Sequence, residues 1–215
     1  MSDEIKELKE KLFSGRKNGY DRFDSTEQAA MEAYCDGYKS FLDKGKTERL
    51  CAVETIRLAE EKGDKPYVRG MKVSSGDKVY LCNRGKSVML AHIGKKSLAE
   101  GAQIAAAHID SPRLDLKPNP LYEESELAYF KTHYYGGLRK YQWVTIPLEL
   151  RGVVALKDGT SVAVNIGADD GDAKLVITDL LPHLGQEQSK KPLAEAVPGE
   201  TLNLLLGSRP IGGED

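Results

Sequence analysis

The stretch at residues 101–112, Gly-Ala-Gln-Ile-Ala-Ala-Ala-His-Ile-Asp-Ser-Pro, constrains the fold more than any other part of the sequence. Its small and apolar residues predict a buried β-strand, in which Ile104 and His108 face the same side because side chains alternate along a strand. Asp110 continues that register, and Pro112 cannot continue a central ladder. We therefore expect the strand to end here, with His108 and Asp110 exposed to a cleft.

The His-x-Asp spacing of residues 108 and 110 suits a metal site. A histidine that binds a metal usually donates its second ring N–H to a carboxylate or a carbonyl, which fixes the tautomer and raises the basicity of the ring. A purely structural histidine at a strand end has the same spacing. The pattern alone leaves both interpretations open.

The charge balance argues against two classes of partner. The 215 residues carry 31 lysine and arginine side chains against 33 aspartate and glutamate side chains, which gives a net charge of −2. This balance predicts no binding to nucleic acid and none to a membrane surface. No run approaches the roughly 18 apolar residues of a membrane span, and the charged N-terminus has no secretory apolar region. We expect a cytoplasmic protein.

The cysteines argue against two kinds of stabilising cross-link. The three residues Cys35, Cys51 and Cys82 are far apart and form no Cys-x-x-Cys pair. An odd, scattered set is typical neither of a structural zinc site nor of a disulfide framework.

Three helices are predicted in the first 63 residues. Ser2 and Asp3 can cap the first helix, and the run Ser25–Gln28 has the pattern of a capping box that begins the second. The third is expected to begin at Thr47 and to end near Lys62. An apolar stripe on the second helix is interpreted as core packing rather than as a ligand surface, and consists of Met31, Tyr34, Tyr38, Phe41 and Leu42.

Two β-hairpins are predicted, around Arg84-Gly85-Lys86 and around Asp158-Gly159, the second being the strongest hairpin signal in the sequence. Their strands are expected at residues 78–83, 87–93, 148–156 and 161–166. Further strands are expected at residues 113–120 and 174–181, residues 201–206 could form a strand or a helix, and residues 185–199 read as a loop. Because the composition becomes almost wholly β-patterned after residue 135, we expect two domains, residues 1–135 and 136–215.

The acidic run at residues 169–172, Asp-Asp-Gly-Asp, is compared with a calcium loop. It lacks the alternating ligand spacing and the closing glutamate of an EF-hand, so a solvated turn is expected. His92 is interpreted as a core or edge histidine and His133 as structural.

Several segments resemble the M18 aminopeptidases, the group of aspartyl aminopeptidase and vacuolar aminopeptidase I. The run Ala107-His-Ile-Asp-Ser-Pro112 is similar to the family's His-Thr-Asp-Ser-Pro segment, with isoleucine in place of threonine at position 109. Other similar segments follow in the family's order and span nearly the whole chain: residues 41–49, Tyr134-Tyr-Gly-Gly-Leu138 and Pro182-His-Leu184.

The resemblance implies a metal-dependent aminopeptidase that removes N-terminal residues from peptides by activating water between two metal ions. Zinc is the usual metal of the family, with cobalt or manganese as alternatives. His108 matches a metal ligand, and Asp110 matches the carboxylate that orients it. His183 matches a substrate-binding histidine that the family's dimerisation domain offers to a neighbouring subunit. Homo-oligomers built from dimers are expected.

The resemblance also implies an α/β fold, a zinc-exopeptidase-like α/β/α catalytic domain with an inserted β-rich dimerisation domain. The catalytic domain is expected to be incomplete here, because no later segment has the family's acidic and histidine ligand pattern. The chain is then either a truncated product or a natural fragment. Two functions compete on this basis: an aminopeptidase with His108 and Asp110 in its metal site, and a non-catalytic assembly module that dimerises.

Overall fold

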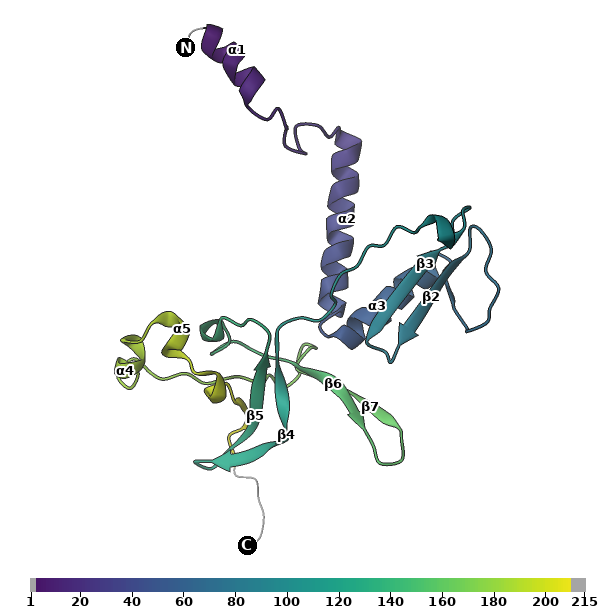
Figure 1. The fold of residues 1–215 in the computed structure, drawn as a ribbon. Coiled ribbons are helices and arrows are strands. Elements are labelled where there is room, and N and C mark those ends of the chain that lie inside the picture. Colours follow the sequence, from purple (N-terminus) through teal and green to yellow (C-terminus); the bar gives the residue numbers. More distant parts are fainter. Residues whose placement is uncertain (1–2, 210–215) are drawn as a thin grey trace. The chain divides into compact units, whose positions relative to one another are not determined.

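The structure is a computed structural model that describes residues 3–209 and divides after Gly45 into two compact units. The first unit contains helices α1 (Asp3–Leu12) and α2 (Ser25–Lys44), both as predicted (Figure 1). Ser2, one of the two predicted caps of α1, lies outside the described residues.

The capping box of α2 lies one residue before the predicted position. The Asp24 side chain accepts a hydrogen bond from the Glu27 amide at 2.8 Å, and the Glu27 carboxylate accepts one from the Asp24 amide at 3.0 Å. This reciprocal pair makes Asp24 the N-cap in place of Ser25. The predicted core packing of the α2 stripe is not observed, because α2 has no buried residue and Tyr34 is 76% exposed.

In the second unit, helix α3 (Glu48–Glu61) packs against a hairpin formed by β2 (Lys78–Asn83) and β3 (Ser87–His92). Thr47, the predicted start of α3, is its N-cap, with its hydroxyl accepting a hydrogen bond from the Leu50 amide at 3.2 Å. The short strand β1 (Lys65–Pro66) pairs with β2 in parallel. The hairpin prediction is confirmed, with Asn83 opposite Ser87 across the turn.

The predicted strand at residues 101–112 is wrong. A short 3₁₀ turn, η1 (Leu98–Glu100), precedes this segment, and the segment itself forms no strand. Ile104, the predicted core-facing residue, is 87% exposed. A β-strand is held by ladder hydrogen bonds to a neighbour, and no strand among residues 3–209 pairs with this stretch.

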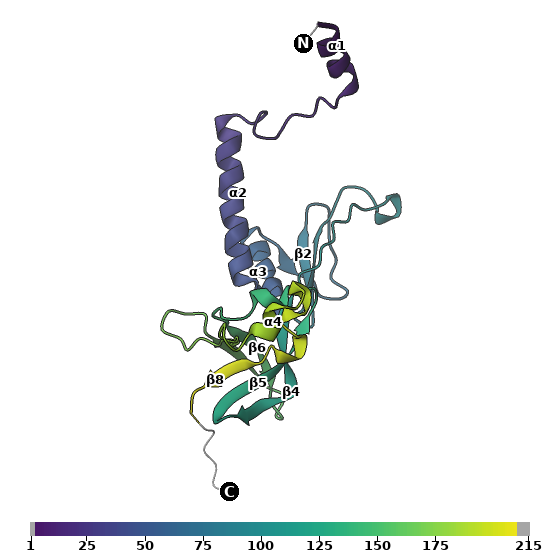
Figure 2. The same cartoon turned by 90° about the vertical axis from the view of Figure 1, so that its left-hand side faces the viewer.

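Residues 113–135 form two long antiparallel strands, β4 (Arg113–Glu124) and β5 (Leu127–Tyr135), and β8 (Leu204–Gly207) pairs with β5. Figure 2 shows the resulting order β4-β5-β8. The β4–β5 register shifts between Leu116 and Leu121, where Pro118 and Pro120 supply no amide donor. This sheet includes residues on both sides of the predicted domain boundary at 135/136, which stays a prediction.

The second predicted hairpin is also confirmed, as β6 (Leu150–Ala155) paired with β7 (Ser161–Ile166). The predicted strand at residues 174–181 is reduced to two isolated bridges, from Leu175 to Leu148 and from Val176 to Leu205. Consecutive residues thus pair with different partners, which prevents a continuous ladder.

The predicted loop at 185–199 contains the short helices α4 (Gln186–Ser189) and α5 (Leu193–Ala196), and the turns η2 (Lys140–Gln142) and η3 (Gly199–Thr201) complete the described elements.

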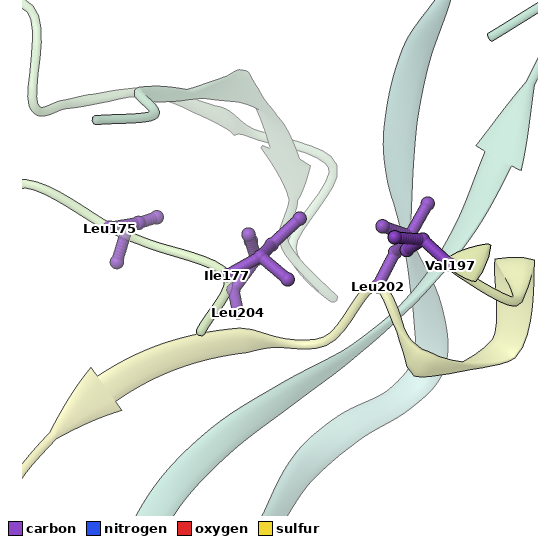
Figure 3. Close-up of a cluster of buried hydrophobic side chains, with 5 residues drawn as sticks. All are labelled: Leu175, Ile177, Val197, Leu202 and Leu204. Atoms are coloured by element: carbon purple, nitrogen blue, oxygen red, sulfur yellow. The ribbon is translucent and has the colours of Figure 1, made fainter. Parts of the chain in front are cut away.

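A cluster of buried hydrophobic side chains lies at the β4-β5-β8 sheet, which contributes Leu204 from β8. Figure 3 shows its members: Leu175, Ile177, Val197, Leu202 and Leu204. Buried Thr132 on β5 joins the cluster to the sheet, because its hydroxyl donates to the Leu202 carbonyl and its amide donates to the Asn203 side chain at 3.2 Å. Residues far apart in sequence are therefore held together around β5.

Candidate active site

His108 and Asp110 lie close together in the unpaired segment that precedes β4. The His108 Nδ1 atom is 2.9 Å from the Asp110 backbone carbonyl oxygen and 3.4 Å from the Asp110 Oδ1 atom. The predicted proximity of imidazole and carboxylate is therefore present, although a strand does not produce it. The His108 side chain is 84% exposed, and the Asp110 side chain is 40% exposed.

The partners of Nδ1 determine which ring nitrogen carries the proton in the neutral imidazole. A carbonyl oxygen and an ionised carboxylate can only accept hydrogen bonds. Nδ1 must then be the donor, which leaves the lone pair on Nε2. This is the arrangement that a metal-binding histidine needs, with Nε2 available and Nδ1 held by a second group.

The Asp110 carboxylate is held from its other side by β5. The Tyr135 hydroxyl donates a hydrogen bond to Asp110 Oδ2 at 2.9 Å. This hydrogen bond is the main cause that lowers the pKa of Asp110, and it raises the pKa of Tyr135. Both shifts favour an ionised Asp110 that faces a neutral tyrosine.

A cation fixes the Tyr135 ring. The Arg113 guanidinium lies 4.1 Å from the centroid of this ring, in the geometry of a cation–π contact. Arg113 Nε also donates to Asp115 Oδ1 at 2.7 Å, so the guanidinium is itself anchored. Arg113 and Tyr135 are opposite each other in the β4–β5 register.

The other predicted residues lie elsewhere. His183 is exposed in a turn after Pro182, and among the described residues it contacts neither His108 nor Asp110. His133 stacks on Tyr134 with ring centroids 5.4 Å apart, and His92 ends the edge strand β3. At the acidic turn, the Lys174 ammonium donates to the backbone carbonyls of Gly167 and Asp169.

The described residues do not make a complete zinc site. Structural and catalytic zinc ions take three or four protein ligands. Among residues 3–209 no three His, Cys, Asp or Glu side chains are grouped so that they could hold a metal ion. His108 offers one imidazole nitrogen, and Asp110 is engaged in holding that imidazole.

Comparison with known proteins identifies the family. Residues 41–208 match the profile of a peptidase family described as aminopeptidase I zinc metalloprotease (M18). The chain belongs to the M18 family. A probable M18 family aminopeptidase 1 from Clostridium acetobutylicum is 47% identical over 204 residues, which cover 93% of this chain and 44% of that protein. Its counterpart from Thermotoga maritima is 43% identical over 185 residues, covering 86% of this chain and 40% of that protein.

Solved M18 structures share the fold. The crystal structure of an M18 aminopeptidase from Thermotoga maritima aligns with a TM-score of 0.85 and 40% identity over 94% of this chain and 44% of that chain. Aminopeptidase I from Borrelia burgdorferi aligns with a TM-score of 0.78. The mixed α/β architecture is thus that of M18 aminopeptidases, and this M18 chain spans less than half the length of these relatives. No helix in the described part is long and apolar enough to span a membrane.

Sequence reasoning missed two residues of this site, Tyr135 and Arg113. Tyr135 lies in the Tyr-Tyr-Gly-Gly segment that carries part of the family resemblance. Gly136 has a φ of +77°, and a Cβ atom there would lie 3.6 Å from Pro112. The glycines were a usable signal, because a left-handed residue directly after a strand indicates that the chain turns back sharply.

Proposed function

We propose that this M18 chain serves a zinc-dependent aminopeptidase that releases N-terminal residues from peptides. The observation that supports the proposal is the geometry at His108, where Nδ1 is directed at Asp110 and Nε2 is left exposed for a metal. In this proposal His108 is a metal ligand and Asp110 orients it. Zinc is the metal that the family's description names, and cobalt or manganese would suit the same nitrogen.

The remaining ligands are not grouped with His108 in the described residues. We propose that the part of the family sequence that this chain does not cover, or a second chain, supplies them and completes a site for two metal ions. The residues present hold and orient one imidazole, and they provide no further step of the reaction.

Substrate binding and assembly belong to the same proposal. Exposed His183 would contact the substrate in a neighbouring subunit, in homo-oligomers built from dimers in the cytoplasm. One solved relative, at 17% identity, is described as a dodecamer. The β-rich region after residue 135 would then be the inserted dimerisation domain.

A second candidate is an assembly module without catalysis. The incomplete ligand set is the observation that favours it. In that case His108 and Asp110 are inherited residues without a metal, and the chain acts through self-association.

Elemental analysis of the purified chain, together with hydrolysis of aminoacyl substrates, separates the two candidates. If His108 is a ligand, H108A lowers the zinc bound per chain, whereas H133A, which alters an imidazole stacked on Tyr134, leaves it unchanged. Zinc that the wild type binds and that H108A retains in full would contradict the ligand role.

A chimaera tests the activity itself. The Clostridium acetobutylicum relative is used with its matching 204-residue region replaced by that of this chain. We expect zinc-dependent release of N-terminal residues, reduced at least about 10³-fold by H108A and unchanged by H133A. A folded, zinc-loaded chimaera that is inactive, beside an active parent, would favour the assembly module.

A further inference from the structure

Side-chain contacts, and not ladder hydrogen bonds, attach the end of the His-x-Asp segment to the β4–β5 pair. Residues 101–112 form no strand, so backbone pairing does not fix Asp110. Its carboxylate instead accepts from the Tyr135 hydroxyl at 2.9 Å, and Tyr135 is the last residue of β5.

The Tyr135 ring is held from more than one side. Arg113 covers the ring at 4.1 Å and is tied to Asp115 at 2.7 Å. Arg113 Nη1 is also 4.0 Å from Glu48 Oε2, at the first turn of α3. Immediately after the ring, left-handed Gly136 brings the chain back to Pro112. Tyr135 is thus a donor on a paired strand, and Asp110 is an acceptor on an unpaired segment.

We infer that Tyr135 is the positioning residue that orients the Asp110 carboxylate, and through it fixes the tautomer of the His108 imidazole. The Tyr135 hydroxyl engages Oδ2, which leaves Oδ1 directed at His108 Nδ1 at 3.4 Å while the Asp110 carbonyl accepts at 2.9 Å. Without the hydroxyl the carboxylate can rotate about its χ angles. The interaction of the carboxylate with the Nδ1 proton then weakens. A larger fraction of the neutral His108 rings carries the proton on Nε2 instead, where it blocks the lone pair.

This inference rests on the proposed function of His108, but its test needs neither metal nor activity. The 215-residue chain is labelled with ¹⁵N-histidine, and the ring nitrogens of its four histidines are recorded by NMR near pH 8.5, above the usual histidine pKa of about 6.5. H108A identifies the His108 signals. In the wild type we expect Nδ1 protonated and Nε2 unprotonated.

Tyr135→Phe removes only the hydroxyl that holds Asp110. We expect the His108 signals to move toward the Nε2-protonated tautomer that predominates in free histidine. The matched control is Tyr134→Phe, which alters the neighbouring residue on β5, whose ring stacks on His133. This control leaves the His108 tautomer unchanged. In separate samples labelled uniformly with ¹⁵N, unaltered amide signals from β4 and β5 show that neither variant disturbs the sheet.

Asp110→Asn establishes whether Tyr135 acts through Asp110. This variant keeps the backbone carbonyl but removes the charged acceptor, so it is expected to shift the His108 tautomer in the same direction. Adding Tyr135→Phe to Asp110→Asn then produces little further shift, because the two changes affect one interaction.

Two outcomes overturn the inference: a His108 tautomer unchanged in Tyr135→Phe, or an equal shift in Tyr135→Phe and Tyr134→Phe. Failure of the proposed function appears differently. In that case Tyr135→Phe still shifts the tautomer, while H108A leaves zinc binding and the activity of the chimaera unchanged.

Discussion

The buried cluster beside β5 and the segment at residues 101–112 are both rich in apolar residues, yet their environments are opposite. Ile177 in the cluster is 1% exposed, whereas Ile104 in the segment is 87% exposed. Bridges and side-chain hydrogen bonds to β5, β8 and residue 148 hold the cluster's residues in place. The segment is held at its end by the hydrogen bond that Asp110 accepts from Tyr135.

This difference shows that apolar composition does not decide burial in this chain. A side chain is buried where a partner surface covers it, and partners exist around β5 but not around residues 101–107 within the described structure. The candidate metal ligand His108 therefore lies in the unpaired segment at residues 101–112. The side-chain contacts of that segment with β5 position it.

The largest expected effect tests the difference in burial between the cluster and the segment at residues 101–112. Ile177→Ala removes a fully buried side chain and is expected to lower the free energy of unfolding by about 2–5 kcal/mol. The same truncation at Ile104 is expected to cost less than about 0.5 kcal/mol, because that side chain is already in water. Urea denaturation followed by the fluorescence of Trp143, the single tryptophan, which packs against the cluster, measures both. Equal losses of unfolding free energy in the two variants would contradict the difference in burial.

A smaller effect tests how tightly the cluster region is packed. A Cβ atom at Gly199 would overlap the Tyr134 ring, so Gly199→Ala is expected to destabilise the chain by about 1–3 kcal/mol. Gly137→Ala is the control, since a Cβ atom there meets no atom within 4 Å. Denaturation of Gly199→Ala in a Tyr134→Ala background recovers most of the loss if the ring is the cause. A loss that persists in this background would point to the backbone instead.

The smallest effect is a pH dependence of the tie between β4 and η3. Lys117 Nζ donates to Glu200 Oε2 at 2.7 Å, and this hydrogen bond lowers the pKa of Glu200 below its ordinary value of 4.5. The unfolded chain binds this proton more readily than the folded chain. The stabilisation is therefore present above pH 4.5 and is lost as the pH falls through the lowered pKa. Urea denaturation between about pH 3 and pH 6 should show a weaker acid dependence for Lys117→Met than for the wild type. Identical pH profiles would mean that the pair contributes nothing measurable, as is common for exposed pairs.

The elements predicted correctly depend on local sequence. Helix α3 begins directly after its N-cap Thr47 because the hydroxyl of this residue satisfies an amide three residues later, and β6–β7 turns at Asp158-Gly159 because these residues suit a tight turn. The cap of α2 was misplaced by one residue, since Asp24–Glu27 and Ser25–Gln28 both have the spacing of a capping box and only the structure distinguishes them.

The incorrect predictions concern segments whose structure depends on partners that are distant in sequence. Residues 101–112 and 174–181 have the composition of strands, but a strand exists only if a neighbour completes its ladder. The candidate site divides in the same way. His108 and Asp110 are two residues apart and were predicted to meet, whereas Tyr135 lies 25 residues from Asp110 and was not predicted to be its partner.

By itself the sequence determined the helices α1 to α3, the two hairpins, the M18 family and the proximity of an imidazole to a carboxylate. All of these follow from residues close together in the chain or from a family pattern read along it. The tertiary structure alone decided that residues 101–112 stay unpaired, that the core forms around β5, and that Tyr135, covered by Arg113, holds Asp110. The reason is physical: burial, ladder pairing and the hydrogen-bond partner of a carboxylate depend on which distant surfaces meet, and no local pattern specifies those surfaces.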